Sequence, residues 1–292
     1  MREGIEPGVL YLVPTPIGNL GDWSPRARAV VSAVDLVLAE DTREFRVLCT
    51  ALGIVPAAVW SFHQHNVGQR LPAVLDRLRQ GQAVALVADR GMPAVSDPGQ
   101  ELVAAALREG LRVSPLPGPS AAVAAFAASG FPHPFVFWGF LPARGRARAE
   151  ALSAVAATPW TQVLYEAPHR LERTLADLAN LVGEEREVAV VREISKRFEE
   201  VWRGSLRAAR LHAGGWRGEL VLVVAPKSPQ GRDVAEPDWD RLLEAVRRAT
   251  ASGQSLRDAV RTVAAEAGVS RRLLYQRAQE DPSVTPPPTS TP

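Results

Sequence analysis

The 292-residue sequence contains a single cysteine, Cys49, so it cannot form an internal disulfide bond. A chain without disulfides is typical of a reducing compartment, which favours the cytoplasm. No apolar stretch approaches the roughly 20 residues that a membrane-spanning helix needs. The apolar run near the N-terminus covers only residues 9–13, too short for the core of a signal peptide. The sequence therefore predicts a cytoplasmic protein that does not enter a membrane.

Several motifs of common enzyme classes are also absent. The first apolar run is not followed by G-x-G-x-x-G, and the chain has no G-x-x-x-x-G-K-[ST], which excludes the usual dinucleotide and P-loop sites. It also lacks the G-x-S-x-G turn of α/β-hydrolases. No set of cysteines and histidines has zinc spacing, and His63 and His65 taken alone are more typical of a surface loop. No metal site is predicted.

Lysine is scarce as well: of the 34 basic residues only Lys196 and Lys227 are lysines, although the net charge is just +2. The simplest explanation is a GC-rich genome. The alternative explanation is that the arginines contact phosphates and bases of a nucleic acid, which would require them to be clustered.

What is present is an ordinary globular composition, 46% hydrophobic and 23% charged, long enough for two or three domains. Short apolar runs alternate with helical patterns through the first part of the chain. Strands are expected at 9–13, 35–39, 59–62, 84–88 and 112–116, and helices at 24–33, 43–52, 68–79 and 100–108. Ser24 and Pro25 form a good helix start. This alternation predicts an α/β fold that begins with a parallel doubly wound domain, residues 8–119.

The pattern changes after residue 117. We expect an Ala-rich helix at 120–129 capped by Ser120, strands at 135–139, 161–166, 187–193, 199–204 and 218–225, and a helix at 169–181. These elements predict a second α/β domain with a mixed, largely antiparallel sheet, residues 120–228. A polar linker, residues 227–236, leads to a helical unit at 237–280, and the Pro/Ser/Thr-rich segment 281–292 is expected to be disordered.

Four loops of the first predicted domain follow strands, at 14–20, 40–43, 89–99 and 117–120. Ordinary turns explain the Gly and Pro of any one loop. Four such loops on one edge of a parallel sheet indicate a site for a small, partly polar ligand, because ligands bind at the carboxyl ends of the strands. The residues alone do not name the ligand.

The loops also carry a resemblance. The motifs are PTPIGNL (14–20), EDTR (40–43), HQHN (63–66), DRGMPAVSDPG (89–99), LPGPSA (116–121), YEAPHR (165–170), REISK (192–196) and GELVL (218–222). Together, and in this order, they resemble the ribosomal RNA small-subunit methyltransferase I group of the tetrapyrrole methylase superfamily. The resemblance covers roughly residues 9–278. It implies a two-domain tetrapyrrole-methylase-like fold with a C-terminal helix-turn-helix unit, and a homodimer.

The resemblance implies an enzyme that transfers a methyl group from S-adenosylmethionine to the ribose 2′-oxygen of a cytidine in the decoding centre of 16S rRNA, in the assembled 30S subunit. The cofactor would lie between the two α/β domains. The residues expected to bind it are Pro16, Asp89, Gly91, Met92, Pro93, Val95, Ser96, Ser120, Ala121, Tyr165, Glu166 and Glu219. We expect Asp97 and Pro98 mainly to start the next helix. Arg90 stands where relatives have a small residue, and we expect it to point outward.

A base that takes the hydroxyl proton would assist the reaction, and the motifs offer several candidates: Glu40, Asp41, His63, Glu166, Glu193 and Lys196. Glu166, Glu193 and Lys196 are preferred as catalytic residues, because the second domain is expected to face the acceptor. Lys196 would serve only if burial or a neighbouring cation such as Arg192 lowered its pKa.

RNA contacts are expected at Arg144, Arg146 and Arg148, in a loop after the strand at 135–139. Residues 256–277 have a helix-turn-helix pattern, with Ser270 as the cap of a basic second helix that carries Arg271, Arg272 and Arg277. A helix pair that only packs on its neighbours explains the pattern about as well, and the resemblance favours RNA binding. Two other functions stay open: C-methylation of a tetrapyrrole, and a helix-turn-helix DNA-binding regulator that is not an enzyme.

Overall fold

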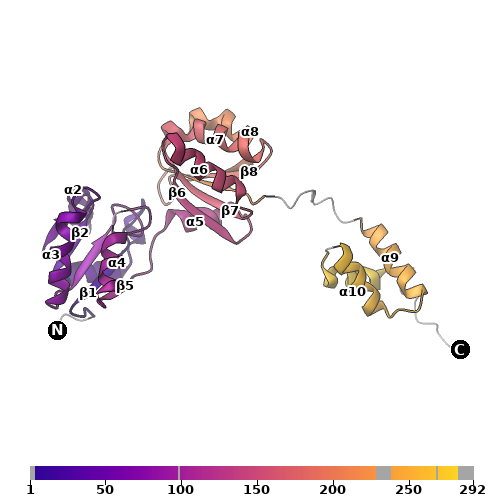
Figure 1. Ribbon diagram of the computed structural model, residues 1–292, viewed down its shortest axis with the longest axis horizontal. Helices are drawn as coiled ribbons and strands as arrows, with labels where there is room; N and C mark the ends of the chain where they lie inside the picture. Colours follow the sequence, from indigo (N-terminus) through magenta and orange to yellow (C-terminus); the bar gives the residue numbers. More distant parts are fainter. Residues whose placement is uncertain (1–3, 98, 228–237, 268, 282–292) are drawn as a thin grey trace. The chain divides into compact units, whose positions relative to one another are not determined.

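The computed structural model describes residues 4–97, 99–227, 238–267 and 269–281. The chain divides into two compact units, residues 1–227 and 228–292. Unit 1 contains two five-stranded sheets, and unit 2 is helical (Figure 1). No helix within the described ranges is long and apolar enough to cross a membrane.

The first sheet is entirely parallel, with strand order β3-β2-β4-β1-β5. Its strands are β1 (Val9–Val13), β2 (Leu36–Ala39), β3 (Val59–Ser61), β4 (Val84–Val87) and β5 (Arg112–Pro115). The helices between them are α1 (Pro25–Ala33), α2 (Thr42–Ala51), α3 (Val67–Arg79) and α4 (Gln100–Arg108), and a short 3-10 helix, η1, spans Leu20–Asp22. The predicted α/β alternation is confirmed, and Ser24 caps α1 by accepting a hydrogen bond from the Ala27 amide.

Helices cover both faces of this sheet because the strands are apolar on both sides. Val9, Tyr11 and Val13 of β1 pack with α1 and α2, whereas Leu10 and Leu12 pack with α3 and α4. The two strands that flank β4 lead into helices on one face, β1 into α1 and β2 into α2, whereas β4 leads into α4 on the other face. This reversal opens a crevice at the carboxyl end of β4.

The second sheet is mixed, in the order β6-β7-β10-β8-β9, and only the β6–β7 pair is parallel. Its strands are β6 (Phe135–Phe140), β7 (Thr161–Glu166), β8 (Glu187–Arg192), β9 (Glu200–Ser205) and β10 (Leu220–Val224). The associated helices are α5 (Ala121–Ser129), α6 (Gly145–Ala157), α7 (Pro168–Val182) and α8 (Leu206–His212), with a 3-10 turn η2 (Ala213–Gly215). Ser120 caps α5, as expected.

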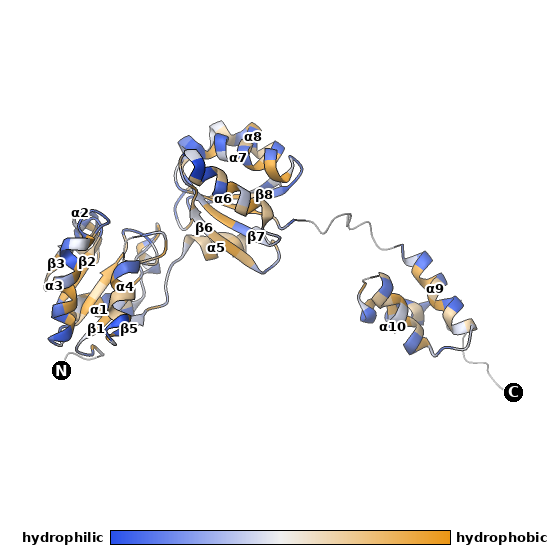
Figure 2. Cartoon of the chain, viewed as in Figure 1, coloured by the Kyte–Doolittle hydropathy of each residue, from blue (hydrophilic) through white to orange (hydrophobic). Residues whose placement is uncertain are grey.

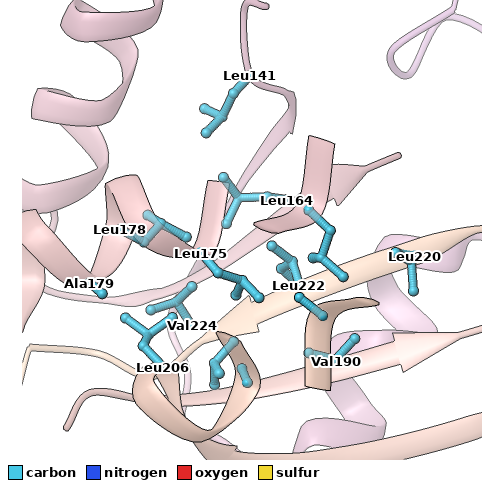
Figure 3. Close-up of a cluster of buried hydrophobic side chains, with 14 of the residues drawn as sticks. Leu141, Leu164, Leu175, Leu178, Ala179, Val190, Leu206, Leu220, Leu222 and Val224 are labelled. Atoms are coloured by element: carbon cyan, nitrogen blue, oxygen red, sulfur yellow. The ribbon is translucent and has the colours of Figure 1, made fainter. Parts of the chain in front are cut away.

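Leucine and valine side chains of the second sheet pack against α6, α7 and α8 on one face (Figure 3). Among the described helices, α5 is the one that packs on the other face. Figure 2 shows hydrophobic residues concentrated in strands such as β1 and in helix α5. Two helices of this region, α6 and α8, were not predicted. Helix α6 begins inside the segment expected to be an arginine-bearing loop and contains Arg146 and Arg148, and its Ala-rich sequence favours a helix.

Unit 2 consists of α9 (Trp239–Ala251), α10 (Leu256–Ala267) and α11 (Arg271–Glu280), packed around Val246, Val260 and Leu274. Ser270 caps α11, as predicted, by accepting from the Leu273 amide. Most of the predicted linker and all of the tail after Asp281 lie outside the described residues. The domain boundaries at 119, 228 and 237 stay predictions.

Candidate functional site

A cleft of about 460 Å³ lies in unit 1 at the carboxyl ends of the first sheet's strands, and residues of the second sheet complete it. Its lining residues are Ile17, Glu40, Glu44, Asp89, Arg90, Gly91, Met92, Val95, Ser96, Asp97, Ser120, Ala121, Phe140, Tyr165, Glu166, Ala167, Pro168, Ile194, Gly218, Glu219, Leu220 and Val221. The lining is mixed, with apolar side chains and several carboxylates. Such a cleft suits a ligand that is part apolar and part cationic.

The loop after β4 forms one wall, and its backbone is held in place by the loop after β1. The Thr15 and Gly91 amides each donate to the other's carbonyl, at 3.0 and 3.1 Å, and the Thr15 hydroxyl donates to the Ala88 carbonyl. Gly91 has a φ of 78°, a conformation that glycine adopts readily. Ala94 and Ser96 also have positive φ, at 64° and 65°. Positive φ in residues with a side chain is strained and is typical of functional loops.

Of the six carboxyl groups in the cleft lining, Glu40, Asp89 and Asp97 influence one another through their charges. Asp89 Oδ1 accepts a hydrogen bond of 2.9 Å from the Asp41 amide. Burial, with the charges of Glu40 and Asp89, raises the pKa of Asp97 to about 7. Burial and the Asp89 charge also raise the pKa of Glu40, against a smaller opposite effect of His63. The cluster therefore carries unfavourable negative charge that a cationic ligand would relieve.

Asp97 does not have its expected role. Helix α4 begins at Gln100 with Gly99 as its N-cap residue, at a φ of 126°, and the cap makes no side-chain hydrogen bond. Asp97 instead lines the cleft. Pro98 lies outside the described residues.

Arg90 is also placed differently from expectation. It lines the cleft and forms an ion pair with Glu219, which precedes β10 of the second sheet. The Arg90 side chain is about half exposed, so the predicted outward orientation is met only in part, and the guanidinium is held at the cleft by this pair. Glu219 Oε2 also lies 3.0 Å from Lys196 Nζ, and Lys196 Nζ lies 2.9 Å from Glu193 Oε1. These four side chains form a charged network along the cleft.

Glu166, which was expected both to bind the cofactor and to act in catalysis, is almost fully buried at the end of β7. Its Oε1 accepts from the Ala167 amide at 2.8 Å and its Oε2 accepts from the Thr174 hydroxyl. Arg170 Nε lies 3.4 Å from Oε1. Because both oxygens already have partners, this carboxylate holds the start of α7 in place and is poorly placed to take a proton.

The other two catalytic candidates, Glu193 and Lys196, lie beside the cleft but not in its lining. Glu193 Oε1 accepts from the Glu219 amide at 2.9 Å, so it belongs to the charged network. Arg192 pairs with Glu200. Asp41 caps α2, with its carboxylate accepting from the Arg43 and Glu44 amides.

Of the predicted cofactor residues, the cleft brings together most of the set: Asp89, Gly91, Met92, Val95, Ser96, Ser120, Ala121, Tyr165, Glu166 and Glu219. Pro16 and Pro93, both buried, are not in its lining. Sequence reasoning missed Ile17, Phe140, Ile194 and Val221, among others. Ile17, Ile194 and Val221 lie within the motifs PTPIGNL, REISK and GELVL, which was the available signal.

The predicted RNA-contact residues of unit 1 do not form a basic loop. Arg148 on α6 is buried, and its guanidinium donates to Asp177, Thr174 and the Pro142 carbonyl. It is therefore a structural residue, and its predicted RNA contact is withdrawn. Arg146 pairs with Glu150, while Arg144 is exposed.

In unit 2, Arg271 and Arg272 are exposed at the start of α11. The Arg277 guanidinium carbon lies 4.5 Å from the centre of the Trp239 ring, so Arg277 packs on α9. An arginine stacked on tryptophan stabilises the packing of two helices.

Comparison with known proteins identifies the class. The family model "Tetrapyrrole (Corrin/Porphyrin) Methylases" matches residues 9–210. A uroporphyrin-III C-methyltransferase from Thermus thermophilus, solved in complex with S-adenosylhomocysteine, superimposes with a TM-score of 0.54 at 21% identity, over 74% of this chain and 96% of that chain. This likeness confirms the fold.

Two curated relatives narrow the class. Both carry the name ribosomal RNA small subunit methyltransferase I. The protein of Synechocystis sp. is 42% identical over 276 residues, 94% of this chain and 98% of the relative. The protein of Mesorhizobium japonicum is 41% identical over 280 residues, 94% of this chain and 92% of the relative. The chain belongs to the ribosomal RNA small subunit methyltransferase I family of tetrapyrrole methylases.

Proposed function

We propose that this protein is an S-adenosylmethionine-dependent methyltransferase that methylates the ribose 2′-oxygen of a cytidine in the decoding centre of 16S rRNA, in the cytoplasm and on the 30S subunit. The observation that carries the proposal is the similarity to the small-subunit rRNA methyltransferases over 94% of the chain. The cleft supports it independently, because its chemistry fits the cofactor.

The fit rests on charge and shape. S-adenosylmethionine carries a sulfonium and an α-ammonium group, and bound in the cleft it would supply an electrophilic methyl group. The carboxyl cluster of Glu40, Asp89 and Asp97 provides negative charge for these cationic groups. Met92 and Val95 provide apolar walls for the adenine or the thioether. The Ser120 side chain caps α5, whose first backbone N–H groups favour a carboxylate.

Methyl transfer to a hydroxyl is an in-line displacement, so most of the acceleration comes from positioning the acceptor oxygen. Among the cleft carboxylates, those of Glu40, Glu44 and Asp97 make no hydrogen bond or ion pair with any described residue, and of these Asp97 has its pKa raised to about 7, near the operating pH. A neighbouring cation favours its ionised form, which can then accept the proton of the acceptor hydroxyl. We therefore propose Asp97 as the proton acceptor, in place of Glu166, Glu193 and Lys196.

Two further parts of the proposal concern partners. The exposed Arg271 and Arg272 of unit 2 support RNA binding through phosphate contacts. Helix α5 supports a homodimer, because a helix that is apolar on all sides is normally covered. Its outer residues Val123, Ala124, Ala127 and Ala128 are exposed in the single chain. Light scattering on the purified protein measures the oligomeric state.

The deciding experiment supplies cofactor with a labelled methyl group to 30S subunits lacking the modification, with a tetrapyrrole and duplex DNA as control substrates. Label in the ribose of one 16S cytidine is the expected result. Label in the tetrapyrrole alone would contradict the proposal. Specific DNA binding without methyl transfer would identify the regulator instead.

A further inference from the structure

A short loop between β8 and β9, residues 193–199, connects the cleft to the protein surface. We call it the β8–β9 loop. Ile194 lines the cleft, while Arg197 and Phe198 at the other end are exposed. The Phe198 side chain is 63% exposed, which makes it the most exposed aromatic residue within the described part of the chain.

The loop is held by many contacts. The Glu193 amide donates to the Glu219 carbonyl at 2.9 Å, and the Lys196 amide donates to the Glu193 carbonyl at 3.0 Å. The Ser195 amide donates to the Glu199 carboxylate at 2.6 Å. Glu193 and Ser195 have positive φ, at 50° and 66°. These contacts enforce the strained backbone, so the loop tip, which we define as residues 195–198, has a fixed position.

The loop also contacts the first sheet's side of the cleft. The Ser195 hydroxyl donates to the Asp22 carboxylate. Lys196 packs so closely on Gly18 that a Cβ at Gly18 would lie 2.4 Å from Lys196 Cγ. Gly18 follows the cleft residue Ile17. The tip therefore stands at the rim where both walls of the cleft meet.

The chemistry of the tip is that of a stacking platform. The Arg197 guanidinium carbon lies 5.5 Å from the centre of the Phe198 ring. The exposed Phe198 ring is not buried in the hydrophobic core, so its burial does not stabilise the fold. Aromatic rings of this kind stack on unpaired bases, and an adjacent arginine adds a cation to the stack.

The arginines around the rim are not neutralised. Arg43, Arg197 and Arg217 are exposed, and none of them forms an ion pair with a described residue. Each lies next to, or within three residues of, a cleft residue: Glu44, Ile194 and Gly218. By contrast, Arg90 in the cleft lining and Lys196 beside the cleft are paired with carboxylates. The rim therefore presents uncompensated positive charge to an approaching polyanion.

We infer that the tip of the β8–β9 loop is the element that receives single-stranded RNA at the cleft: Phe198 stacks on an unpaired base beside the target nucleotide, and Arg43, Arg197 and Arg217 contact the flanking phosphates. This inference rests on the proposed function and assigns the residues that present the acceptor. A fixed tip next to the cleft positions the neighbouring base, so the ribose enters at a defined depth.

The test compares Phe198→Ala and Phe198→Trp with the matched control Trp160→Ala. Trp160 is a 49% exposed aromatic residue just before β7, at the end of that strand opposite the cleft residue Glu166. Phe198→Ala is expected to raise KM for the 30S subunit about tenfold, the loss of one base stack. Phe198→Trp is expected to restore it, and Trp160→Ala to leave it unchanged. Calorimetric cofactor affinity should be the same for all, which shows that the cleft is intact.

Arginine variants test the phosphate contacts. Each of Arg43→Ala, Arg197→Ala and Arg217→Ala should reduce the slope of log affinity against log salt by about 1. Arg108→Ala is the control, because Arg108 is exposed and lies on α4, away from the cleft lining.

An unchanged KM in Phe198→Ala would overturn the inference, as would a change of oligomeric state in that variant, which would make the tip a protein contact. Wild-type protein that methylates no 30S subunit would instead refute the proposed function.

Discussion

Arg90 and Glu219 form an ion pair that joins the loop after β4 of the first sheet to the segment before β10 of the second. Glu219 also contacts Lys196, at 3.0 Å. The Glu219 carboxylate thus contacts Arg90, from the loop after β4 of the first sheet, and Lys196, from the loop after β8 of the second sheet. Both side chains of the Arg90–Glu219 pair are about half exposed, so the pair contributes little to overall stability. Its position predicts a local effect on the cleft.

Replacing Arg90 by Met should loosen this link and weaken cofactor binding, by up to about fivefold, since an exposed pair contributes about 0–1 kcal/mol. Titration calorimetry measures the effect. Arg79→Met is a matched control, because Arg79 has the same 49% side-chain exposure and pairs with Glu109 far from the cleft. Equal cofactor affinity in the two variants would show that the pair has no role in the site.

Cofactor binding should depend on pH through Asp97. In the free protein the pKa of Asp97 is about 7, so the group is largely protonated at pH 6. A cation in the cleft favours the ionised form, so binding releases a proton and affinity should rise as the pH increases from 6 to 8. Calorimetry in buffers of different ionisation enthalpy counts the released protons. Asp97→Asn should release fewer and show a flatter profile, whereas an unchanged profile would assign the proton to another group.

The same group affects folding. The pKa of Asp97 is raised in the folded protein, so between pH 4 and 7 the native state binds more protons than the unfolded state, and this contribution makes stability fall as the pH rises. Above pH 7 the penalty is fully present. Asp97→Asn should therefore raise Tm at pH 8 by about 2–4 °C, allowing for solvent screening of a partly exposed group, and should have almost no effect at pH 4. Thermal unfolding at the two pH values makes the comparison.

The sequence was most informative about the first sheet. A run such as Val84–Val87, apolar at every position, fits a strand covered on both faces, and parallel strands put their carboxyl ends at one edge, so the loops that form the cleft followed directly. The second wall was less predictable. Ile194 and Val221 reach the cleft through antiparallel pairing, and no local pattern sets which ends of those strands meet the first sheet.

Charged residues were the least predictable part of the site. Arg90, Asp97 and Arg148 all differ from expectation because their partners are distant in sequence: Glu219, Glu40 and Asp177. Spacing along the chain shows which charges are available. Only the folded arrangement decides which of them pair, which are buried and which stay exposed.

Arg148 should be important for stability and not for RNA binding. Its guanidinium is buried and hydrogen-bonded to Asp177 and Thr174. Arg148→Met removes these bonds and leaves the Asp177 carboxylate only the longer contact with Arg173, at 3.9 Å, so it should lower the free energy of unfolding by about 3 kcal/mol. Arg146 lies two residues away but is exposed, and its ion pair is with Glu150. Arg146→Met should therefore change the free energy of unfolding by less than about 0.5 kcal/mol. Urea unfolding of both variants tests the difference, and equal stabilities would contradict the structural role.

The arginines of α11 should divide into two functions. Arg271 and Arg272 are exposed at the helix start, and replacing both by Ala should reduce the salt dependence of rRNA binding by a slope of about 2 while leaving the stability of unit 2 unchanged. Arg277 stacks on Trp239, so Arg277→Ala should instead destabilise unit 2 by about 0.5–1 kcal/mol.

Removing residues 237–292 should weaken 30S binding far more than cofactor binding, because the cleft residues all belong to unit 1. Equal 30S affinity of the truncated and full-length proteins would rule out an RNA-binding role for the helix-turn-helix unit, and would leave the rim of the cleft as the surface that holds the substrate.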